Sequence, residues 1–519
     1  MKKRIASILV VVLVLVSALS IMAACQTECE KNGHKYNETT GVCSVCGKTN
    51  PDFTGGCDNG HKFVNGICSE CGKTITSANP NKTIVVLTSI GQNLQEVWNN
   101  AVESFEEKYP GWEIDLRSIS GGYTGLRKQV MSELQAGSQP DLALCYPDHV
   151  ANYMTGGKVV DMTKYINSTD TIFVSNDGDD SQVVKTGFSA EEISDFLEMF
   201  WDEGKAESYA SYGQYGYNSE TMLTLPLAKS TEVLFYNKTI LDQEGIAVPT
   251  TWDELWAACR KLAEKYPDCT PLGYDSQANW LITMCEQNGW GYTTADGRDE
   301  DHYLFNNDNV KRWLQDIQSY YIDEKLFTTE DMYGAYTSNL FKLGTDKGCF
   351  FCIGSTGGAS NQNTSAFEVG VAALPGSKDD EGRTHYNAIS QGPSMVMFKT
   401  NDSNAEEKQY MTFLFIKELL DPVFQAEYST ASGYSPVRYS VRENPVYLAA
   451  IEKGQKCTGT TVDKALYVSS TMSDRFFTSP AFVGSANARD AVGEMITSIL
   501  KGSDVQGELD AALTACRGK

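Results

Sequence analysis

Residues 225–255 read LPLAKSTEVLFYNKTILDQEGIAVPTTWDEL, and this stretch combines the signals of one strand and two helices. The run TEVLFY at 231–236 is apolar, β-branched and aromatic, which is typical of a buried strand. A short helix is predicted over 239–244, because Gly245 suits the left-handed conformation of a helix C-cap. The pattern Thr-x-x-Glu that begins at Thr251 is a capping box and predicts the start of a second helix. Together these signals predict part of an α/β domain.

The chain upstream of this stretch alternates between strand and helix. Residues 83–89 read TIVVLTS and form a predicted buried strand. A second strand is predicted over 112–118, and residues 137–144 form a turn that leads into a third. Helices are predicted between them, over 95–109 and 124–136. A β-α-β-α-β order predicts a parallel sheet, in which ligands bind at the carboxyl ends of the strands.

The chain downstream continues in the same manner. Residues 339–358 read as a helix, a strand and a Gly/Ser turn, and 367–376 and 388–399 read as further strands. A long helix is predicted over 404–427, followed by SGYSPVR at 432–438. The two halves together are long enough for two domains, each with its own core.

Several of these blocks resemble those of the family 1 extracellular solute-binding proteins, the sugar-binding components of ABC importers. The resemblance rests on a strand ending in Tyr236-Asn237-Lys238, on Gly245-x-x-x-Pro249, and on Thr-Trp-Asp-Glu-Leu from Thr251. It covers most of residues 82–519 and includes three further blocks: GGYTGLRKQVMSELQAGSQPDLAL at 121–144, 339–358 and 432–438.

The resemblance implies a periplasmic-binding-protein-like fold of type II, in which two α/β lobes are joined by a hinge. It implies that ligand is held in the cleft, that closure brings both lobes onto it, and that a permease recognises the closed, monomeric form. The lobes are predicted as 83–229 with 354–392, and 230–353 with 393–519, and the chain is expected to cross between them near 226–231, 352–356 and 389–394.

Candidate ligand-binding side chains lie in the predicted loops after the strands and at the crossovers. Aromatic faces can stack on sugar rings, and polar groups can bind sugar hydroxyls. A single aromatic residue can equally belong to the core, and Arg438 can instead form an ion pair between the lobes. The candidates are Tyr123, Tyr146, Asp148, Ser230, Thr231, Trp280, Ser355, Thr356, Gln391, Gly392, Tyr434 and Arg438.

The glycerol-3-phosphate and glycerophosphodiester branch of the family offers an alternative ligand class. The sequence pattern of this branch is similar to that of the present chain at several of the candidate residues. The arginine that faces the phosphate in this branch, however, has no clear match in the present chain. Ala481 stands in the aligned place, with Arg475 and Arg489 nearby. A neutral sugar or oligosaccharide is therefore the favoured ligand, and a phosphorylated compound is the alternative.

Catalysis is the less favoured interpretation. A secreted carbohydrate-active enzyme would use paired carboxylates, yet the chain carries no recognisable acid/base motif, no Gly-x-Ser-x-Gly and no His-Glu-x-x-His. The resemblance implies a binding protein with no catalytic residues and no catalytic cofactor.

Residues 1–25 have the features of a lipoprotein signal peptide. Lys2, Lys3 and Arg4 precede an apolar segment at 5–21, and Met22-Ala23-Ala24-Cys25 resembles a bacterial lipobox. Lipidation of Cys25 would hold the mature protein at the extracytoplasmic face of a bacterial membrane. An uncleaved anchor or simple secretion is the alternative.

Residues 26–76 contain two similar Cys- and His-rich repeats, followed by a polar linker at 77–82. Each repeat offers three thiolates and one imidazole, which is the ligand set of a closed structural zinc site, so two structural zinc ions are predicted. Disulfides are the alternative, because an exported protein meets an oxidising environment. The predicted ligands are Cys29, His34, Cys43 and Cys46 in the first repeat, and Cys57, His61, Cys68 and Cys71 in the second.

The formal net charge of −24 excludes one class of partner. Nucleic-acid binding requires a basic face to contact phosphates, and zinc ribbons in this acidic, exported chain are not expected to supply one.

Overall fold

The computed structural model describes residues 62–64, 67–68, 81–175, 181–296, 301–379 and 381–518. The predicted signal segment, Cys25 and all predicted zinc ligands except Cys68 lie outside these residues. Within the described ranges, no helix combines the length and apolarity needed to cross a membrane. The chain forms two compact units, one comprising Met1–Asn81, Tyr165–Phe188 and Asp402–Glu407, and the other comprising Lys82–Lys164, Ser189–Asn401 and Lys408–Lys519.

The first unit contains a four-stranded sheet with the order β2-β1-β6-β7. β1 (Lys62–Val64) pairs antiparallel with β2 (Ile67–Cys68) and parallel with β6 (Thr171–Ser175). β6 forms an antiparallel pair with β7 (Ser181–Lys185). Strands from the Cys-rich N-terminal segment therefore share a sheet with strands that follow much later in the chain.

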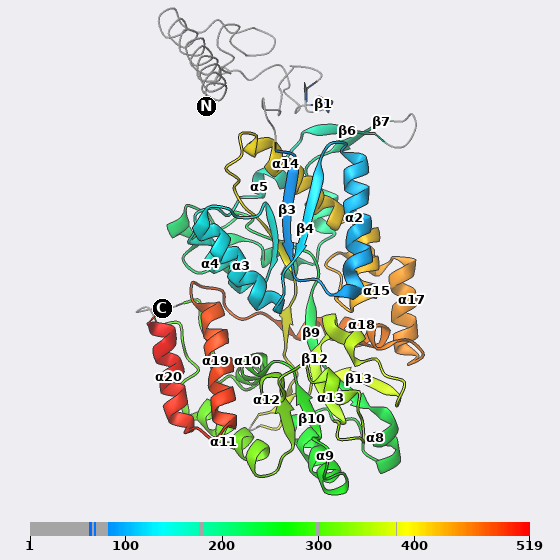
Figure 1. The fold of residues 1–519 in the computed structure, drawn as a ribbon, viewed down its shortest axis with the longest axis vertical. Coiled ribbons are helices and arrows are strands. Elements are labelled where there is room, and N and C mark those ends of the chain that lie inside the picture. Colours follow the sequence, from blue (N-terminus) through cyan, green and yellow to red (C-terminus); the bar gives the residue numbers. More distant parts are fainter. Residues whose placement is uncertain are drawn as a thin grey trace, which may run out of the picture. The chain divides into compact units, whose positions relative to one another are not determined.

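In the second unit, the first lobe is built on a five-stranded sheet with the order β4-β3-β5-β17-β8 (Figure 1). β3 (Thr83–Thr88) runs parallel to β4 (Glu113–Ser118) and β5 (Leu142–Cys145), which confirms the parallel arrangement predicted from the sequence. β17 (Ser394–Met397) runs antiparallel to β5 and to β8 (Leu225–Pro226).

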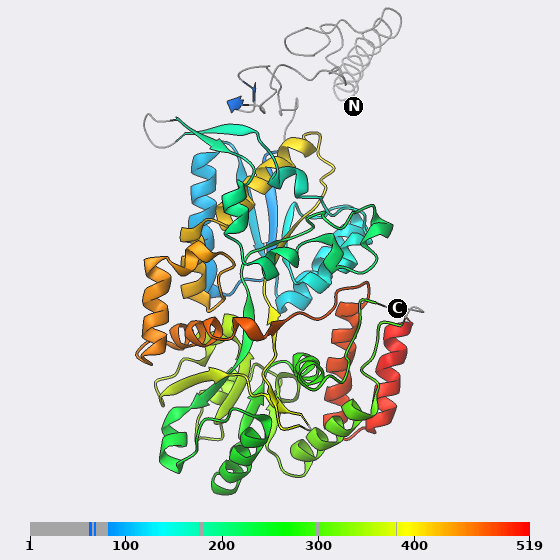
Figure 2. The same ribbon diagram turned by 180° about the vertical axis from the view of Figure 1, so that it is seen from behind.

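Helices cover the first sheet because their apolar faces pack against it. α2 (Gln95–Lys108) and α3 (Gly122–Ala136) lie on opposite sides of the sheet in Figures 1 and 2. Trp98 and Phe105 of α2 are completely buried. The other helices between β5 and β8 and after β17 are α4 (Pro147–Met154), α5 (Thr163–Ile166), α6 (Ala190–Ser194), α7 (Glu198–Asp202), α14 (Ala405–Leu419) and α15 (Pro422–Ser432). Short 3₁₀ turns are η1 (Gln92–Leu94), which follows β3, and η2 (Ala206–Ser208) and η3 (Tyr212–Tyr215), which precede β8.

The second lobe is built on a seven-stranded sheet whose central strand is β9 (Ser230–Asn237). The order β11-β10-β12-β9-β16-β18 describes six of its strands, and β13 also pairs with β9. The other strands of this sheet are β10 (Leu272–Tyr274), β11 (Phe327–Thr329), β12 (Phe351–Ser355), β13 (Val369–Ala373), β16 (Ala388–Gln391) and β18 (Phe476–Phe477).

The predicted helix signals after β9 are confirmed. α8 (Lys238–Glu244) ends at Gly245, which has the left-handed conformation (φ 59°). α9 (Trp252–Lys265) begins with the capping box, in which the Glu254 amide donates to Thr251 Oγ1 at 3.3 Å. The remaining elements of this lobe are α10 (Gln277–Asn288), α11 (Asp308–Ile322), α12 (Glu330–Tyr333), α13 (Ser338–Phe341), η5 (Thr356–Gln362), β14 (Ser377–Lys378), β15 (Thr384–His385), α16 (Tyr439–Arg442), α17 (Pro445–Gln455), α18 (Thr461–Ser470), η6 (Ser473–Arg475), α19 (Ser485–Leu500) and α20 (Val505–Arg517).

Two neighbouring segments join the sheets of the two lobes. The chain passes from β8 to β9 through 227–229, and it returns from β16 to β17 through Gly392 and Pro393. Gly392 has a φ of +132°, and a Cβ there would lie 2.5 Å from the carbonyl oxygen of Ala228. Only glycine therefore lets the segments meet so closely. These strand pairings confirm the crossings predicted near 226–231 and 389–394.

The third predicted crossing, near 352–356, is wrong. β12 pairs with β9 along its whole length up to Ser355, and β13 pairs with the other edge of β9. The segment 354–391 therefore belongs to the second lobe, although it was predicted for the first. Residues 394–397 belong to the first lobe, although they were predicted for the second. The chain passes to the second lobe for the last time after α15, since α18 packs against β13 and η5.

Candidate ligand-binding site

A cavity of about 510 Å³ lies between the two lobes of the second unit. Its first-lobe wall includes residues that follow the parallel strands: 89–91, 93 and 94 after β3, 121–124 after β4, and Tyr146 after β5. This is the edge at which parallel sheets bind ligands. Its other lining residues are Glu232, Asp275, Ser276, Asn279, Glu330, Tyr336, Ser338, Gly354, Ser355, Gly357, Gly358, Ser360, Asn361, Gln362, Gln391, Tyr428, Tyr434 and Arg489.

One side of the cavity is aromatic. The rings of Tyr123 and Tyr146 are stacked, with centroids 4.3 Å apart and planes at 25°. Tyr434 lies 5.8 Å from Tyr428, ring to ring, and packs so closely on Gly357 that a Cβ there would lie 2.4 Å from Tyr434 Cζ. Burial raises the pKa of Tyr434 to about 12, so this phenol is neutral at physiological pH. The tyrosines supply flat apolar faces together with hydroxyl groups.

Another part of the cavity wall carries a hydrogen-bonded network around Glu232. Tyr274 Oη donates to Glu232 Oε2 at 2.6 Å, and Asn279 Nδ2 donates to Glu232 Oε1 at 3.0 Å. Asn279 Nδ2 also donates to Gln391 Oε1 at 2.8 Å. Burial raises the pKa of Glu232 to about 7, although both donors and Arg489 act in the other direction. The network holds these polar groups in fixed positions on the cavity wall.

Arg489 connects the network to the first lobe. Its Nε donates to Asp148 Oδ2 at 3.3 Å, its Nη2 donates to Ser479 Oγ at 3.1 Å, and its Nη1 donates to Asn279 Oδ1. Burial alone would raise the pKa of Asp148, but Arg489, aided by His149, holds it below its ordinary value. The guanidinium charge is therefore already compensated by a carboxylate of the protein.

Asp275 and Glu330 form an acidic part of the second-lobe wall. Asp275 Oδ1 accepts hydrogen bonds from the Thr337 amide and from Thr337 Oγ1, both at 2.6 Å. Burial raises the pKa of Asp275. Burial, followed by the neighbouring charges of Asp275 and Asp331, raises the pKa of Glu330 to about 7.

Five of the predicted ligand-binding residues line this cavity together. Two of them follow the parallel strands β4 and β5, as the parallel-sheet argument expected, whereas the others end β12 or β16 or follow α15. They are Tyr123, Tyr146, Ser355, Gln391 and Tyr434.

Five more lie close to the cavity but behind its surface. Asp148 is buried beneath it and is bound to Arg489. Ser230 and Thr231 are buried in β9, and the Thr231 amide donates to Thr356 Oγ1 at 3.3 Å. Thr356 is itself buried, and Gly392 belongs to the crossover rather than to the wall.

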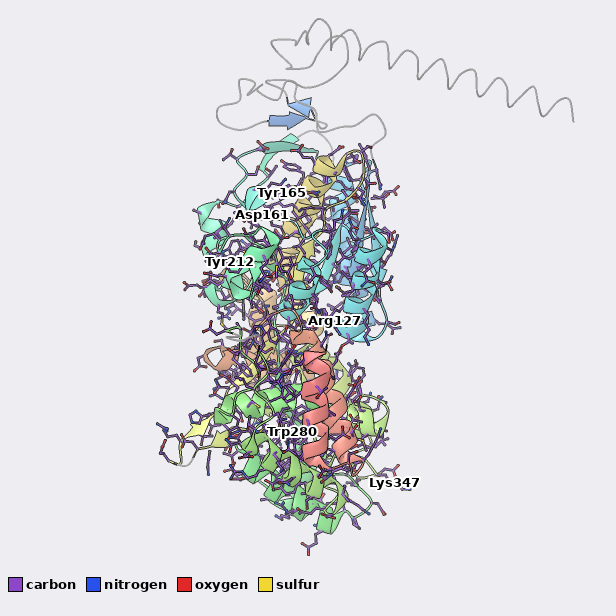
Figure 3. All side chains as sticks on the ribbon, turned by 90° about the vertical axis from the view of Figure 1, so that its left-hand side faces the viewer. Arg127, Asp161, Tyr165, Tyr212, Trp280 and Lys347 are labelled. Atoms are coloured by element: carbon purple, nitrogen blue, oxygen red, sulfur yellow. The ribbon has the colours of Figure 1, made fainter. Side chains whose placement is uncertain are left out.

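Trp280 does not lie in the cavity, contrary to its prediction as a stacking platform. It is completely buried inside the second lobe (Figure 3). Its ring stacks on Tyr274 at 4.9 Å and meets Trp313 edge-on at 5.3 Å. An indole ring surrounded by other aromatic rings is part of the core, so it presents no face to a ligand.

Arg438 is likewise not among the cavity residues. Its Nε donates to Asp195 Oδ2 at 2.7 Å, its Nη1 donates to the carbonyl oxygen of Leu420 at 2.7 Å, and its guanidinium lies over the Phe196 ring. Arg438 follows α15, after which the chain passes to the second lobe, and Asp195 belongs to the first lobe. The structure therefore agrees with the predicted alternative of an ion pair between the lobes.

Sequence reasoning missed most of the polar wall. Glu232 and Asp275 carried a usable signal, since Glu232 interrupts an apolar strand and Asp275 directly follows one. Arg489 lies within a helix, and the sequence marked it only as lying near the aligned place of the phosphate-facing arginine. Lining residues that were not predicted to bind ligand include Glu232, Asp275, Asn279, Glu330, Tyr336, Asn361, Gln362, Tyr428 and Arg489.

Residues 100–453 match the model of the family described as bacterial extracellular solute-binding proteins, which is more than half of the chain. The chain belongs to this family. The resemblance noted in its sequence blocks is thereby confirmed.

Individual members of the family match at low identity. The sn-glycerol-3-phosphate-binding periplasmic protein UgpB of Rhizobium meliloti (strain 1021) is 27% identical over 233 residues, which are 43% of this chain and 51% of that protein. The chain therefore matches about half the length of this curated relative.

Solved structures of solute-binding proteins share the fold. The ABC substrate-binding protein Lmo0181 from Listeria monocytogenes, in complex with cycloalternan, has a TM-score of 0.65 and 16% identity over 84% of this chain and 99% of that one. UgpB from Mycobacterium tuberculosis, in complex with glycerophosphocholine, has a TM-score of 0.63 and 14% identity over 85% and 98%. These similarities confirm the predicted two-lobed periplasmic-binding-protein-like fold.

Proposed function

We propose that this solute-binding protein is the receptor of an ABC importer, which captures a carbohydrate in the interlobe cavity and delivers it to a permease. The observation that carries the proposal is the cavity itself, whose wall combines stacked tyrosines with a fixed polar network. Sugars present apolar C–H faces and hydroxyl edges, which match these two kinds of surface.

The two lobes give the receptor a way to report that it is occupied. Only two short neighbouring segments and the connection after α15 join them. A ligand that contacts both lobes binds the closed arrangement more tightly than an open one, and it therefore shifts the population toward closure. A permease that recognises the closed arrangement would thus select the loaded receptor. No step of this cycle breaks a bond in the ligand.

The proposed location is the extracytoplasmic face of a bacterial membrane. The lipobox-like sequence ending at Cys25 supports lipidation there, and a lipid anchor would keep the receptor close to its permease. We propose that the receptor acts as a monomer, with two structural zinc ions in the N-terminal repeats.

A glycerol phosphate is the second candidate ligand, favoured by the match to UgpB of Rhizobium meliloti. The charge of the cavity argues against it. Arg489 is the sole Lys or Arg among the lining residues of the described cavity, and Asp148 already neutralises it. Three carboxyl groups, of Glu232, Asp275 and Glu330, share the same wall. A phosphate would meet repulsion here, so a carbohydrate fits better.

The proposal is tested by following thermal unfolding of the purified protein with a library of sugars and with sn-glycerol 3-phosphate. In the same samples, reaction products are sought by chromatography. We expect a sugar to raise the unfolding temperature with no product formed. Turnover of the sugar would show that the chain is an enzyme, and stabilisation by sn-glycerol 3-phosphate alone would establish the second candidate ligand.

A further inference from the structure

Two carboxyl groups on the second-lobe wall lack a cationic partner among the described residues. Asp275 Oδ1 accepts both Thr337 hydrogen bonds, whereas no described group donates to Asp275 Oδ2. The carboxyl group of Glu330 likewise pairs with no Lys, Arg or His side chain of the described residues and accepts no hydrogen bond from them. The two carboxyls repel each other, since Asp275 contributes to the raised pKa of Glu330. This part of the wall carries negative charge that the protein itself does not neutralise.

The other charged groups of the cavity differ in this respect. Arg489 is paired with Asp148, and Glu232 accepts two hydrogen bonds from neutral donors and feels the charge of Arg489. The unmatched charge is therefore confined to Asp275 and Glu330. A general acidity of the protein surface would not produce this difference within one cavity.

A buried acceptor without a partner in the described structure belongs to Gln362, which lies near Asp275. Gln362 lines the cavity and is only 2% exposed, yet its Oε1 has no hydrogen-bond partner in the described structure. Gly354 lies between the two groups, because a Cβ there would be 3.1 Å from Asp275 Oδ2 and 3.8 Å from Gln362 Nε2. A buried acceptor is costly unless a donor reaches it, so a ligand donor that reached Gln362 Oε1 would remove this cost.

The missing partner must bring both hydrogen-bond donors and positive charge. Sugar hydroxyls supply donors but no charge. An ammonium group supplies three donors and one positive charge, and it binds carboxylates through strong charge-assisted hydrogen bonds. A metal ion fits less well, since no three His, Cys, Asp or Glu side chains of the described residues are grouped as a metal site.

We propose that Asp275, Glu330 and Gln362 bind an ammonium group of the ligand. Resting on the carbohydrate-receptor function proposed above, this inference makes the ligand an amino sugar or an oligosaccharide that contains one. The aromatic side of the cavity would take the sugar ring, and the acidic wall would distinguish a free amine from its acetylated or hydroxylated counterpart.

The proton balance follows from the groups that face Glu330. Asp275 and Asp331 disfavour its ionised form, and Tyr336 also lies beside the pair. An ammonium would favour the ionised carboxylates, so binding should release protons near pH 7, where Glu330 is partly protonated. Affinity for the amine should therefore increase as the pH rises toward 7.

The test is isothermal titration calorimetry with sugars that share a skeleton and differ in one group. D-glucosamine, N-acetyl-D-glucosamine and D-glucose form one set, and the β-1,4-linked disaccharides of the same three sugars form the other. We expect the amine to bind at least about tenfold more tightly than its acetylated and hydroxylated counterparts in one of the sets. Titration in two buffers with different ionisation enthalpies should show proton release for the amine only.

Glu330→Gln removes one charge and breaks no hydrogen bond of the described structure. It should reduce the preference for the amine, taken as the ratio of its affinity to that of the neutral sugars, about tenfold. Glu264→Gln, on an exposed position of α9, is the matched charge control and should not change this preference. If Glu330→Gln does not fold, Gly354→Ala tests the same wall by placing a methyl group beside Asp275 Oδ2.

The outcomes separate the two proposals. Equal binding of amine and neutral sugars, or an amine preference that survives Glu330→Gln, overturns the ammonium site while the carbohydrate receptor stands. Binding of no sugar in either set removes the ammonium site and contradicts the proposed function as well. Tighter binding of sn-glycerol 3-phosphate than of the amines also overturns the ammonium site.

Discussion

Arg489 in α19 of the second lobe donates through Nε to Asp148 Oδ2 in α4 of the first lobe, at 3.3 Å. The Asp148 side chain is 6% exposed and the Arg489 side chain is 18% exposed, so this ion pair is largely shielded from water. It crosses the space between the lobes directly beside the cavity, because Arg489 is one of the lining residues. The pair therefore links ligand binding to the relation between the two lobes.

Arg489→Gln should destabilise the protein by about 3–5 kcal/mol, because it leaves the Asp148 carboxylate buried without a cation. The double variant Asp148→Asn with Arg489→Gln should recover part of this loss. Urea unfolding measures both. Lys108→Gln is the control, since Lys108 pairs with Glu418 at the surface and should cost less than about 1 kcal/mol. A loss no larger than that of the control would show that the interlobe pair is energetically unimportant.

Gly357 is predicted to be essential for the aromatic side of the cavity. A methyl group at this position would lie 2.4 Å from Tyr434 Cζ, so Gly357→Ala must displace the Tyr434 ring. The ligand should then bind at least about tenfold more weakly, because ring stacking needs a fixed geometry. Affinity for the sugar found in the thermal screen provides the measurement.

Gly358→Ala is the matched control in the adjacent position. The nearest atom to a Cβ there is Asn361 Nδ2 at 3.7 Å, which is an ordinary van der Waals contact. This variant should keep the affinity of the unmodified protein within about twofold. Equal effects of the two substitutions would assign the loss to the turn backbone rather than to Tyr434.

Glu232 is predicted to make stability depend on pH. Burial raises its pKa from 4.5 to about 7 in the folded protein, so between these pH values the native state retains a proton that the unfolded chain has released. Glu232 therefore costs stability progressively as the pH rises through this window, by about 3 kcal/mol above pH 7. Tyr274, Asn279, Arg489 and Asp275 are the groups that face it.

Glu232→Gln cannot titrate, so its stability relative to the unmodified protein should improve between pH 5 and pH 8. Replacing the hydrogen-bond acceptor changes stability by the same amount at both pH values. This contribution therefore cancels when the stability difference at pH 5 is subtracted from that at pH 8. Unfolding midpoints at the two pH values measure the change, and the exposed Glu264→Gln serves as the reference. A difference that does not vary with pH would mean that Glu232 has an ordinary pKa.

The local parts of this fold were predictable from the sequence, and the reasons are physical. The apolar run at 83–88 and the capping box at Thr251 encode a strand and a helix start through neighbouring residues. Tyr123 and Tyr146 were found because the carboxyl ends of parallel strands meet at one edge. Even locally, one helix predicted over 404–427 is broken at Pro422, which begins α15.

Non-local features were not predictable in the same way. The crossing near 352–356 was predicted wrongly because strand pairing depends on residues that are distant in sequence. β12 pairs with β9, and no local sequence pattern of β12 indicates this partner. Arg489 reaches the cavity from a helix more than 200 residues beyond Glu232. The sequence also did not indicate which side of α10 faces the cavity, because both apolar and polar residues of this helix are buried.

Substitution of Trp280 in α10 tests whether this residue belongs to the core or to the ligand-binding site. If it is a core residue, Trp280→Phe should lower the free energy of unfolding by about 1–3 kcal/mol, since a smaller ring leaves a void among Tyr274, Trp313 and Phe327. Sugar affinity of the folded variant should remain within about twofold. A tenfold loss of affinity with unchanged stability would restore Trp280 to the ligand site.

The N-terminal repeats are expected to hold two zinc ions per chain, in closed sites of three thiolates and one imidazole each. Elemental analysis of the full-length mature protein, purified without chelators, should give about two zinc ions per chain. His34→Ala should remove one of them, because it takes away the imidazole of the first repeat. His385→Ala should remove none, since His385 lies in β15, far from the repeats in sequence.

Counting free thiols by alkylation before and after chelation separates zinc from the disulfide alternative. Zinc-bound cysteines become reactive when the metal is removed, whereas disulfides stay unreactive until a reductant is added. His34→Ala is again informative, because a disulfide framework does not need the imidazole and would be unaffected. Fewer than about two zinc ions, with cysteines released by a reductant alone, would establish disulfides in place of the zinc sites.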